Sequence, residues 1–517
     1  MQVWREKVKR GKKRAFRPRG IARPVDRRAR DWYHAETDAF FLFCPWVKHM
    51  RREAFPWRDF LKKTAAIAVP VALQNLMTTT GSMVDTMMIA SLGPTQVGAV
   101  GLCAQFSSLM FSCYWGFVGG GMLFFSQYFG AKDEDGINRS YGLTLLCMMT
   151  VGLLFGLVAV CAPEAVMRLY TDKEAIRAVG VEYLRTAGFS YPLMVFSMAM
   201  AALLRCTGRV RLPLYGSLAA VLTNVFLNWV LIFGHLGAPA MGVRGAALAT
   251  VIAQAVSIAV VIFLAKKSGH RYLLAVRRHF RFGRAFVRGY LRKCFPILMN
   301  EVLIGLGNMA INYVLGRQAE EAIAALAVFR TLEGLVIGFF AGFSNASSVL
   351  VGTEVGAGNI RVASARAFRL VYLCQGIIGG ICVLLIALHT PILTLMGMEG
   401  ERFVHAFGMI CVYGAAAVIR MGNWTQNDTF RAAGDATYGT VLEIVFMWAL
   451  LVPCVCLTGL VWKLPFLLVF TCCYIDEPIR YVLMQRHLYS GKWIRPVTPE
   501  GRKAAEAWMR EKTEGRG

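Results

Sequence analysis

Long apolar runs recur along the whole chain, each about 20 residues with few or no charged side chains, the length a helix needs to cross a bilayer. A membrane admits only helices or closed barrels, because every backbone polar group must find a partner inside the lipid. Barrel strands alternate polar and apolar residues, and these runs do not. The sequence therefore predicts an all-α integral membrane protein.

Of the residues, 56% are hydrophobic, which is more than in ordinary soluble domains. We expect twelve transmembrane helices. Pro192 interrupts the apolar pattern of the fourth span, and Asp476 with Glu477 interrupts that of the twelfth. The expected spans are residues 64–91, 101–128, 141–162, 186–204, 214–234, 245–265, 294–316, 323–350, 370–390, 406–429, 440–460 and 464–486.

The net charge of +26 follows from 57 Lys and Arg against 31 Asp and Glu. An even number of spans places both termini on one side, and the loops on that side hold 19 Lys and Arg against 8 in the opposite loops. Because basic loops stay in the cytoplasm, we expect both termini to be cytoplasmic, in the inner or plasma membrane of the cell. The charge then reflects topology and contact with membrane lipids, and no nucleic-acid partner is expected.

The first 63 residues carry 19 Lys and Arg and no apolar stretch of the signal-peptide type. Two interpretations remain open: a tail that binds anionic lipid, or a basic flank that only fixes the topology. The second is favoured.

Three landmarks occur twice at the same offset of 226 residues. They are Pro70 and Pro296 in the first span of each half, Gly-Ala at 130 and 356, and an arginine followed by glycine three residues later at 205 and 431. Each half therefore has six spans in the same orientation, related by a pseudo-two-fold axis along the membrane normal. This arrangement is typical of alternating-access transporters.

The expected organisation follows from this duplication. It comprises a basic N-terminal tail (1–63), an N-lobe (64–265), a basic inter-lobe loop (266–293), a C-lobe (294–486) and a C-terminal cytoplasmic tail (487–517).

Several catalytic signatures are missing from the sequence. It has no GxxxxGK[ST] phosphate loop and no HExxH pair, and its 14 Cys form no CxxC pair. Neither direct ATP hydrolysis nor zinc chemistry is therefore indicated. We predict no cofactor and no enzymatic activity.

Ionisable residues within spans are costly and mark functional sites. Asp85 lies in the first span, where desolvation disfavours the charged carboxylate and favours reversible binding of a proton or Na⁺. Pro70 lets the same helix bend. Asn224 and Asn228 share a face of the fifth span and Thr250 lies in the sixth, with oxygens that suit Na⁺. Such groups serve equally as hydrogen bonds between helices.

The second half has its own candidates for an ion or substrate site. Glu301 lies in the seventh span, and Asn308 adds to the polar side of this helix. Arg330 and Glu333 in the eighth span are three residues apart and are expected to pair. Arg420 is a further charge in the tenth span.

Five segments together resemble the MATE (multidrug and toxic compound extrusion) family, of the MOP flippase superfamily. They are VDTMMIASLG, GAKDEDG, LLRCTGR, NVFLNWVLIFG and FRAAGD. The resemblance covers about residues 60–497. It implies two six-helix lobes in a V shape and export of amphipathic, often cationic compounds driven by entry of sodium or protons.

The resemblance also implies roles for single residues. Asp85 matches the carboxylate of the family's first helix and Pro70 its bending proline, while Asn224 and Thr250 match members of the N-lobe cation site. Asn228 stands where many members have Asp, which weakens a sodium site and favours the proton.

In the C-lobe, Glu301 matches the glutamate of sodium-coupled members, whereas Arg420 stands where such members have an aspartate. An arginine near Glu301 would neutralise it, so coupling through the N-lobe is favoured.

The leading hypothesis is a monomeric antiporter that exports small organic cations in exchange for H⁺ or Na⁺. An alternative is a flippase for lipid-linked oligosaccharides, which Arg330 and Arg420 keep open. A membrane-embedded enzyme or receptor is disfavoured, because a receptor needs no duplication and no nucleophile–base set stands out.

Overall fold

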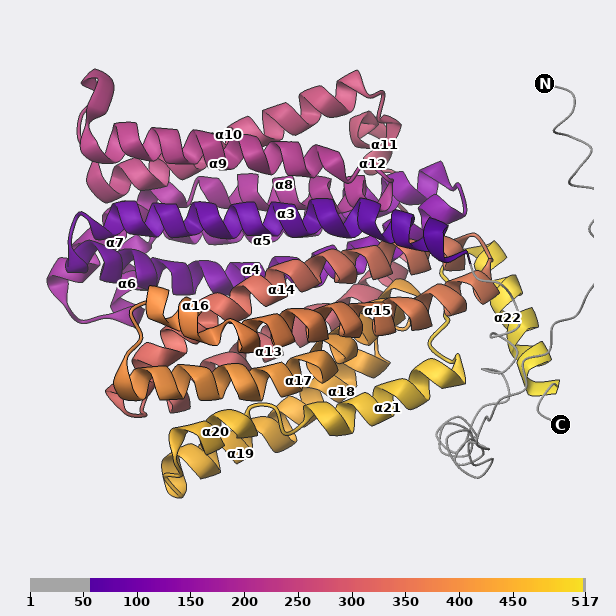
Figure 1. The fold of residues 1–517 in the computed structure, drawn as a ribbon. Helices are drawn as coiled ribbons and strands as arrows, with labels where there is room; N and C mark the ends of the chain where they lie inside the picture. Colours follow the sequence, from indigo (N-terminus) through magenta and orange to yellow (C-terminus); the bar gives the residue numbers. More distant parts are fainter. Residues whose placement is uncertain (1–55, 515–517) are drawn as a thin grey trace, which may run out of the picture. The chain divides into compact units, whose positions relative to one another are not determined.

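The computed structural model describes residues 56–514, without the side chains of residues 276 and 277. Most of the predicted basic tail therefore lies outside the described residues. Within them the secondary structure is helical apart from one isolated bridge between Gly434 and Ile494. The predicted all-α class is confirmed (Figure 1).

The first half contains α3 (Trp57–Ala90), α4 (Pro94–Gly130), α5 (Glu134–Cys161), α6 (Pro163–Tyr170), α7 (Glu174–Ala187), α8 (Ser190–Cys206), α9 (Arg211–Phe233) and α10 (Gly242–Lys267). Two short helices, α11 (Arg271–Leu274) and α12 (Val276–His279), follow in the connecting segment. The second half contains α13 (Arg284–Leu315), α14 (Glu320–Gly356), α15 (Ile360–Ala387), α16 (His389–Leu395), α17 (Gly400–Ala432), α18 (Tyr438–Phe446), α19 (Val452–Cys456), α20 (Phe466–Cys472), α21 (Glu477–Ser490) and α22 (Pro499–Glu514).

Nine helical segments among the described residues are long and apolar enough to cross a membrane. A tenth span is the pair α7 and α8, bent by 48°. The other two predicted spans, the first and the twelfth, do not meet this criterion of length and apolar composition. The first, in α3, is a continuous helix with a polar run between Gln74 and Asp85. The twelfth is split into α20 and α21, and Asp476 lies in the break between them.

The two halves meet along α3 and α4 on one side and α13 and α14 on the other. Gly130 and Gly356, which the duplication places at equivalent positions, both lie in this contact. A Cβ atom on Gly130 would overlap the carbonyl of Thr353, and one on Gly356 would overlap the carbonyl of Gln127. Only glycine permits this approach.

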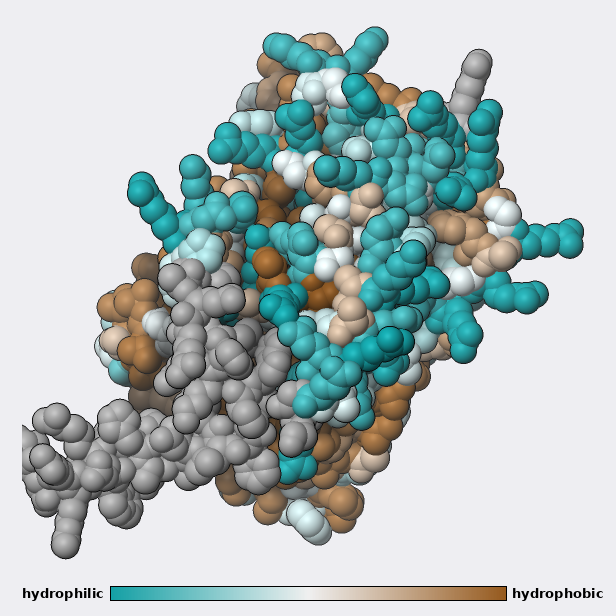
Figure 2. Space-filling model, turned by 90° about the vertical axis from the view of Figure 1, so that its right-hand side faces the viewer, coloured by the Kyte–Doolittle hydropathy of each residue, from teal (hydrophilic) through white to brown (hydrophobic). Residues whose placement is uncertain are grey.

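Gln127 links three segments at the same place. Its Nε2 donates to the carbonyl of Ala432 at 2.7 Å, and its Oε1 accepts from the backbone N–H of Val497 at 2.8 Å. Residues 491–498, which precede α22, therefore lie against the ends of α4 and α17, and the predicted C-terminal tail contains an ordered helix. Figure 2 shows hydrophilic side chains gathered on this end of the described residues.

The close contacts between the halves lie nearest to the α22 end of the four central helices. They include the approach of Gly342 to the carbonyl of Ala68. Near the middle of α3 and α14, Asn75 Nδ2 donates to the carbonyl of Gly338 at 3.2 Å. In the other halves of these helices Met83, Met87, Tyr313 and Leu335 are exposed. The contact at the α22 end therefore holds the halves together in this conformation.

Substituting Gly356→Ala should destabilise this contact, because the added methyl group overlaps a backbone carbonyl that cannot rotate away. We expect the free energy of unfolding to fall by about 1–3 kcal/mol, the usual cost of overpacking. Thermal denaturation of the purified protein measures this.

The matched control is Gly376→Ala in α15, where a Cβ atom meets nothing within 4 Å. This variant should gain stability, by about 0.5–1 kcal/mol. Equal melting temperatures for Gly356→Ala and the unmodified protein would contradict the close approach of α4 and α14.

Candidate functional site

The four residues predicted to form the N-lobe site lie together. Asn228 Nδ2 donates to Asp85 Oδ1 at 2.6 Å and to Asn224 Oδ1 at 3.2 Å, and Asn224 Nδ2 donates to Thr250 Oγ1 at 3.3 Å. The result is a chain of hydrogen bonds from α3 through α9 to α10.

The helices bring these side chains together in a simple way. Asn224 and Asn228 are one turn apart on α9, which packs against both α3 and α10. Beside them, Ile89 of α3 forms a buried apolar cluster with residues of α9 and α10, including Ile232 and Val243. This cluster fixes the three helices next to the polar side chains.

The amide of Asn228 determines what the cluster can bind. Its nitrogen faces the oxygens of both Asp85 and Asn224, the place where a cation shared by those oxygens would lie. Its own Oδ1 is buried and has no hydrogen-bond partner within the described part of the chain. A sodium ion would need the amide to turn, whereas a proton on Asp85 needs no rearrangement.

Pro70 lies inside α3, as predicted, on the stretch that packs against α14. One turn further along the same helix, Gln74 accepts a hydrogen bond from Arg205 at 2.8 Å. Arg205 also donates to Asn345 Oδ1 of α14 at 3.1 Å. This buried guanidinium thus joins the two halves through neutral amides, and it forms no ion pair with any described residue.

The second half contains a cavity of about 880 Å³ at its surface and one of about 730 Å³ among its helices. The inner cavity is lined from α13, α14, α17, α18 and α21, with Trp115 of α4 at one side. Both Glu301 and Asn308 line it. Its charged lining comprises six carboxylates (Glu301, Glu333, Asp428, Glu443, Asp476 and Glu477) and four arginines (Arg330, Arg420, Arg431 and Arg480).

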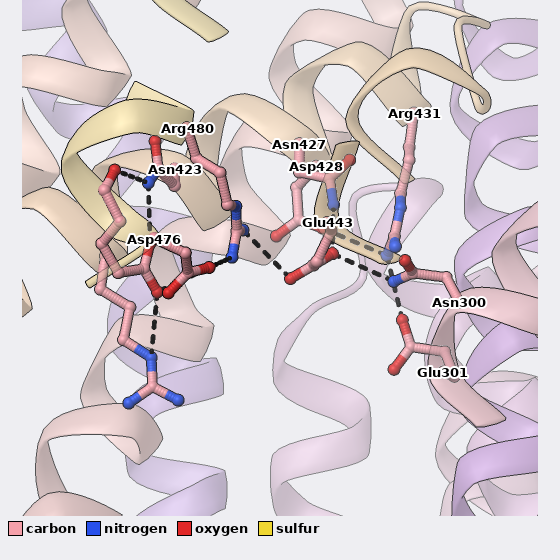
Figure 3. A network of polar contacts seen from close by, with 11 residues as sticks. Asn300, Glu301, Asn423, Asn427, Asp428, Arg431, Glu443, Asp476 and Arg480 are labelled. Carbon is pink, nitrogen blue, oxygen red and sulfur yellow. Dashed lines mark hydrogen bonds and ion pairs between the residues drawn. The ribbon is translucent and has the colours of Figure 1, made fainter. Parts of the chain in front are cut away.

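Glu443 lies at the centre of the network drawn in Figure 3. Its Oε2 accepts from Asn300 at 3.1 Å and from Asn427 at 3.0 Å, and its Oε1 pairs with Arg480 at 3.3 Å. Arg480 continues to Asp476 at 3.0 Å. Ion pairs of this kind lower the cost of burying charges in a membrane.

The hypothesis that Arg420 neutralises Glu301 is wrong. Glu301 pairs with Arg431 at 3.1 Å, whereas Arg420 pairs with Glu333 at 3.1 Å and lies 3.7 Å from Glu477. The two arginines are 11 residues apart on α17, or about 16 Å along a helix axis. Another arginine of α17 does reach Glu301, the one in the duplicated landmark.

The eighth-span pair is confirmed, with Arg330 Nη1 2.6 Å from Glu333 Oε2. Sequence reasoning gave no role to Glu443, Asp476, Glu477 and Arg480. The signal for them was present, since each is a charge inside an apolar segment. Arg480 follows Asp476 and Glu477 at spacings of four and three residues, whereas its contact with Glu443 joins two helices and cannot be assigned by spacing.

Comparison with known proteins identifies the fold and the relatives of the chain. The MatE family model matches residues 70–230 and again 296–456, with the offset of the duplicated landmarks. A probable multidrug resistance protein, YoeA of Bacillus subtilis (strain 168), is 26% identical over 420 residues, covering 79% of this chain and 88% of that protein. The probable multidrug resistance protein NorM of Thermotoga maritima is 22% identical and covers 86% of this chain and 95% of its own length.

Solved structures share the fold at lower identity. A MATE crystal structure in complex with MaL6 has a TM-score of 0.76 and 16% identity, covering 87% of this chain and 97% of that one. An outward-facing multidrug resistance MATE transporter of the MOP superfamily has a TM-score of 0.74 and 16% identity, with 87% and 96% coverage.

Substituting Arg480→Gln should destabilise the second half, because Glu443 and Asp476 lose their shared partner while they stay buried. We expect a loss of about 3–5 kcal/mol in the free energy of unfolding, the cost of breaking a buried ion pair from one side. Thermal denaturation in detergent reports it.

Arg330→Gln is the matched control, since the Arg330 side chain is 43% exposed. Its loss should cost about 1 kcal/mol or less, as for exposed pairs. Similar losses of stability in the two variants would contradict the role of Arg480 as the shared partner of Glu443 and Asp476.

Proposed function

The chain belongs to the MatE family of multidrug and toxic compound extrusion transporters, and from this premise we propose that it exports amphipathic organic cations in exchange for protons by alternating access. Family membership makes it a multi-pass membrane transporter and not an enzyme. The finer points, which are the coupling ion, the substrate class and the residues involved, rest on the arguments below.

The contact between Asp85 and Asn228 carries the proposal of proton coupling. Asp85 is the carboxylate of the N-lobe cluster, and no arginine or lysine pairs with it among the described residues. Binding a proton removes its charge, whereas releasing the proton restores an anion that Asn228 stabilises by its N–H. Asp85 thus alternates between a neutral and an anionic state, and the anionic state depends more on the hydrogen bond from Asn228.

Movement of α3 links this change of charge to access. Pro70 interrupts the hydrogen bonds of α3, and the adjoining part of the helix forms the contact with α14. A bend at Pro70 shifts Asp85 relative to α9 and Gln74 relative to Arg205. We infer that protonation of Asp85 favours such a bend and so loosens the contact between the halves at the α22 end.

The inner cavity of the second half is our candidate for substrate binding. Its volume of about 730 Å³ lies within the range of drug-binding pockets. Six carboxylates against four arginines leave a surplus of negative charge, and Trp115 and Phe340 add aromatic surface. These features favour an amphipathic cation, consistent with relatives described as multidrug resistance proteins.

The flippase alternative is not favoured by this lining. Both arginines that kept it open are paired with carboxylates, Arg330 with Glu333 and Arg420 with Glu333 and Glu477. A pyrophosphate-linked lipid would have to displace those partners.

We also propose that both termini are cytoplasmic, because the loops on their side of the membrane carry the larger number of basic residues. We further propose that the transporter is a monomer.

The test is uptake of a fluorescent organic cation into liposomes that contain the purified protein, under a pH gradient alone and under a sodium gradient alone. Asp85→Asn should reduce proton-driven uptake by about 5- to 150-fold, the range of typical coupling free energies. Asn is nearly isosteric with Asp, so the variant should fold.

Glu301→Gln is the comparison variant. Because Arg431 already neutralises Glu301, this substitution should reduce uptake far less than Asp85→Asn. Uptake driven by sodium alone would contradict proton coupling, and normal uptake by Asp85→Asn would exclude the N-lobe site.

A further inference from the structure

An open trough of about 880 Å³ runs along the start of α13. Its apolar lining includes Phe282, Val287, Leu291 and Phe295. Leu291 is 41% exposed and Phe295 is 59% exposed, so the trough presents apolar surface to its surroundings. It lies outside the inner cavity and outside the N-lobe cluster.

Three arginines border the trough. Arg284, Arg288 and Arg292 follow one another at intervals of four residues, which places them on one side of the helix. All three are exposed, and none forms an ion pair or side-chain hydrogen bond with another described residue. A stripe of three positive charges beside apolar surface is therefore available to an external anion.

The length of α13 indicates where the three arginines lie relative to the bilayer. The helix has 32 residues, or about 48 Å, well beyond the roughly 30 Å of a bilayer's hydrocarbon core. Its apolar part begins near Cys294, so the first three turns extend out of the hydrocarbon. The end face to which they belong is rich in hydrophilic side chains (Figure 2). The arginines thus lie at the level of lipid headgroups.

We propose that the trough binds an anionic phospholipid. The phosphate lies against Arg284, Arg288 and Arg292, whose guanidinium groups match phosphate oxygens in pairs. The acyl chains lie along Leu291 and Phe295. A purely electrostatic site would not need exposed aromatic and aliphatic side chains beside the charges, and a purely apolar contact would not need the arginines.

The site is placed to influence the helix that carries it. The same helix bears Asn300 and Glu301 two to three turns further on, and it packs against α4 across the contact between the halves. A bound lipid would hold the start of α13 at the membrane surface.

The experiment is native mass spectrometry of the full-length protein, mixed with equal amounts of phosphatidylglycerol and phosphatidylcholine. The unmodified protein should retain phosphatidylglycerol preferentially. Replacing Arg284, Arg288 and Arg292 with Gln should reduce this preference by about 5-fold for each arginine, since a basic residue at the membrane surface contributes about that factor. Replacing Leu291 and Phe295 with Ala should also reduce retention.

The matched control replaces Arg209, Arg211 and Lys267 with Gln, three exposed basic residues away from the trough. It removes the same charge and should leave retention unchanged. An equal loss in this control, or no loss in the Leu291 and Phe295 variant, would overturn the proposal in favour of unspecific attraction. Displacement of the lipid by an equal concentration of glycerol phosphate would also overturn it, because the acyl chains would then contribute nothing. These readouts need no transport, so they stand apart from the test of the antiport mechanism.

Discussion

A charge inside a membrane helix is costly, because the hydrocarbon cannot solvate it and groups of the protein must stabilise it instead. The two halves of this chain meet that constraint in opposite ways. Within its predicted spans the first half has one carboxylate, Asp85, which accepts a hydrogen bond from the amide of Asn228. The second half gathers six carboxylates and four arginines around one cavity. In this duplicated fold the N-lobe cluster therefore has a carboxylate with no arginine or lysine paired to it among the described residues, whereas the inner cavity of the second half is lined by many paired charges.

The duplicated arginines show how equivalent positions acquired different uses. Arg205 donates to Gln74 and Asn345 and so bridges the halves through neutral groups. Arg431 pairs with Glu301 within the second half. A guanidinium that is buried against amides gains less than one paired with a carboxylate. The contact made by Arg205 is therefore the easier of the two to exchange for water when the halves separate.

The sequence predicted the features that depend on spacing along one helix or on the duplication. The N-lobe cluster assembled as expected, because Asn224 and Asn228 share a face and α9 and α10 are adjacent in the chain. The partner of Glu301 was assigned wrongly, because the choice between Arg420 and Arg431 depends on how α17 is placed along α13. Likewise, Asp476 and Glu477 interrupt the twelfth span in the sequence, and both lie within reach of Arg480 by spacing. The contact between Glu477 and Arg420 on α17 depends on the fold. The glycine landmarks were visible, yet only the fold shows that Gly130 and Gly356 face each other's helices.

The difference in countercharge bears on which half couples to an ion. Adding a proton to Asp85 removes an isolated anion and leaves no charge behind. Adding one to Glu301 would leave the Arg431 guanidinium with one partner fewer in a buried site, which is costly. The carboxylates of the second half lie beside arginines and outnumber them, so an organic cation can interact with the surplus negative charge of the lining. This difference supports our proposal that the first half binds and releases a proton and that the second half holds the organic cation.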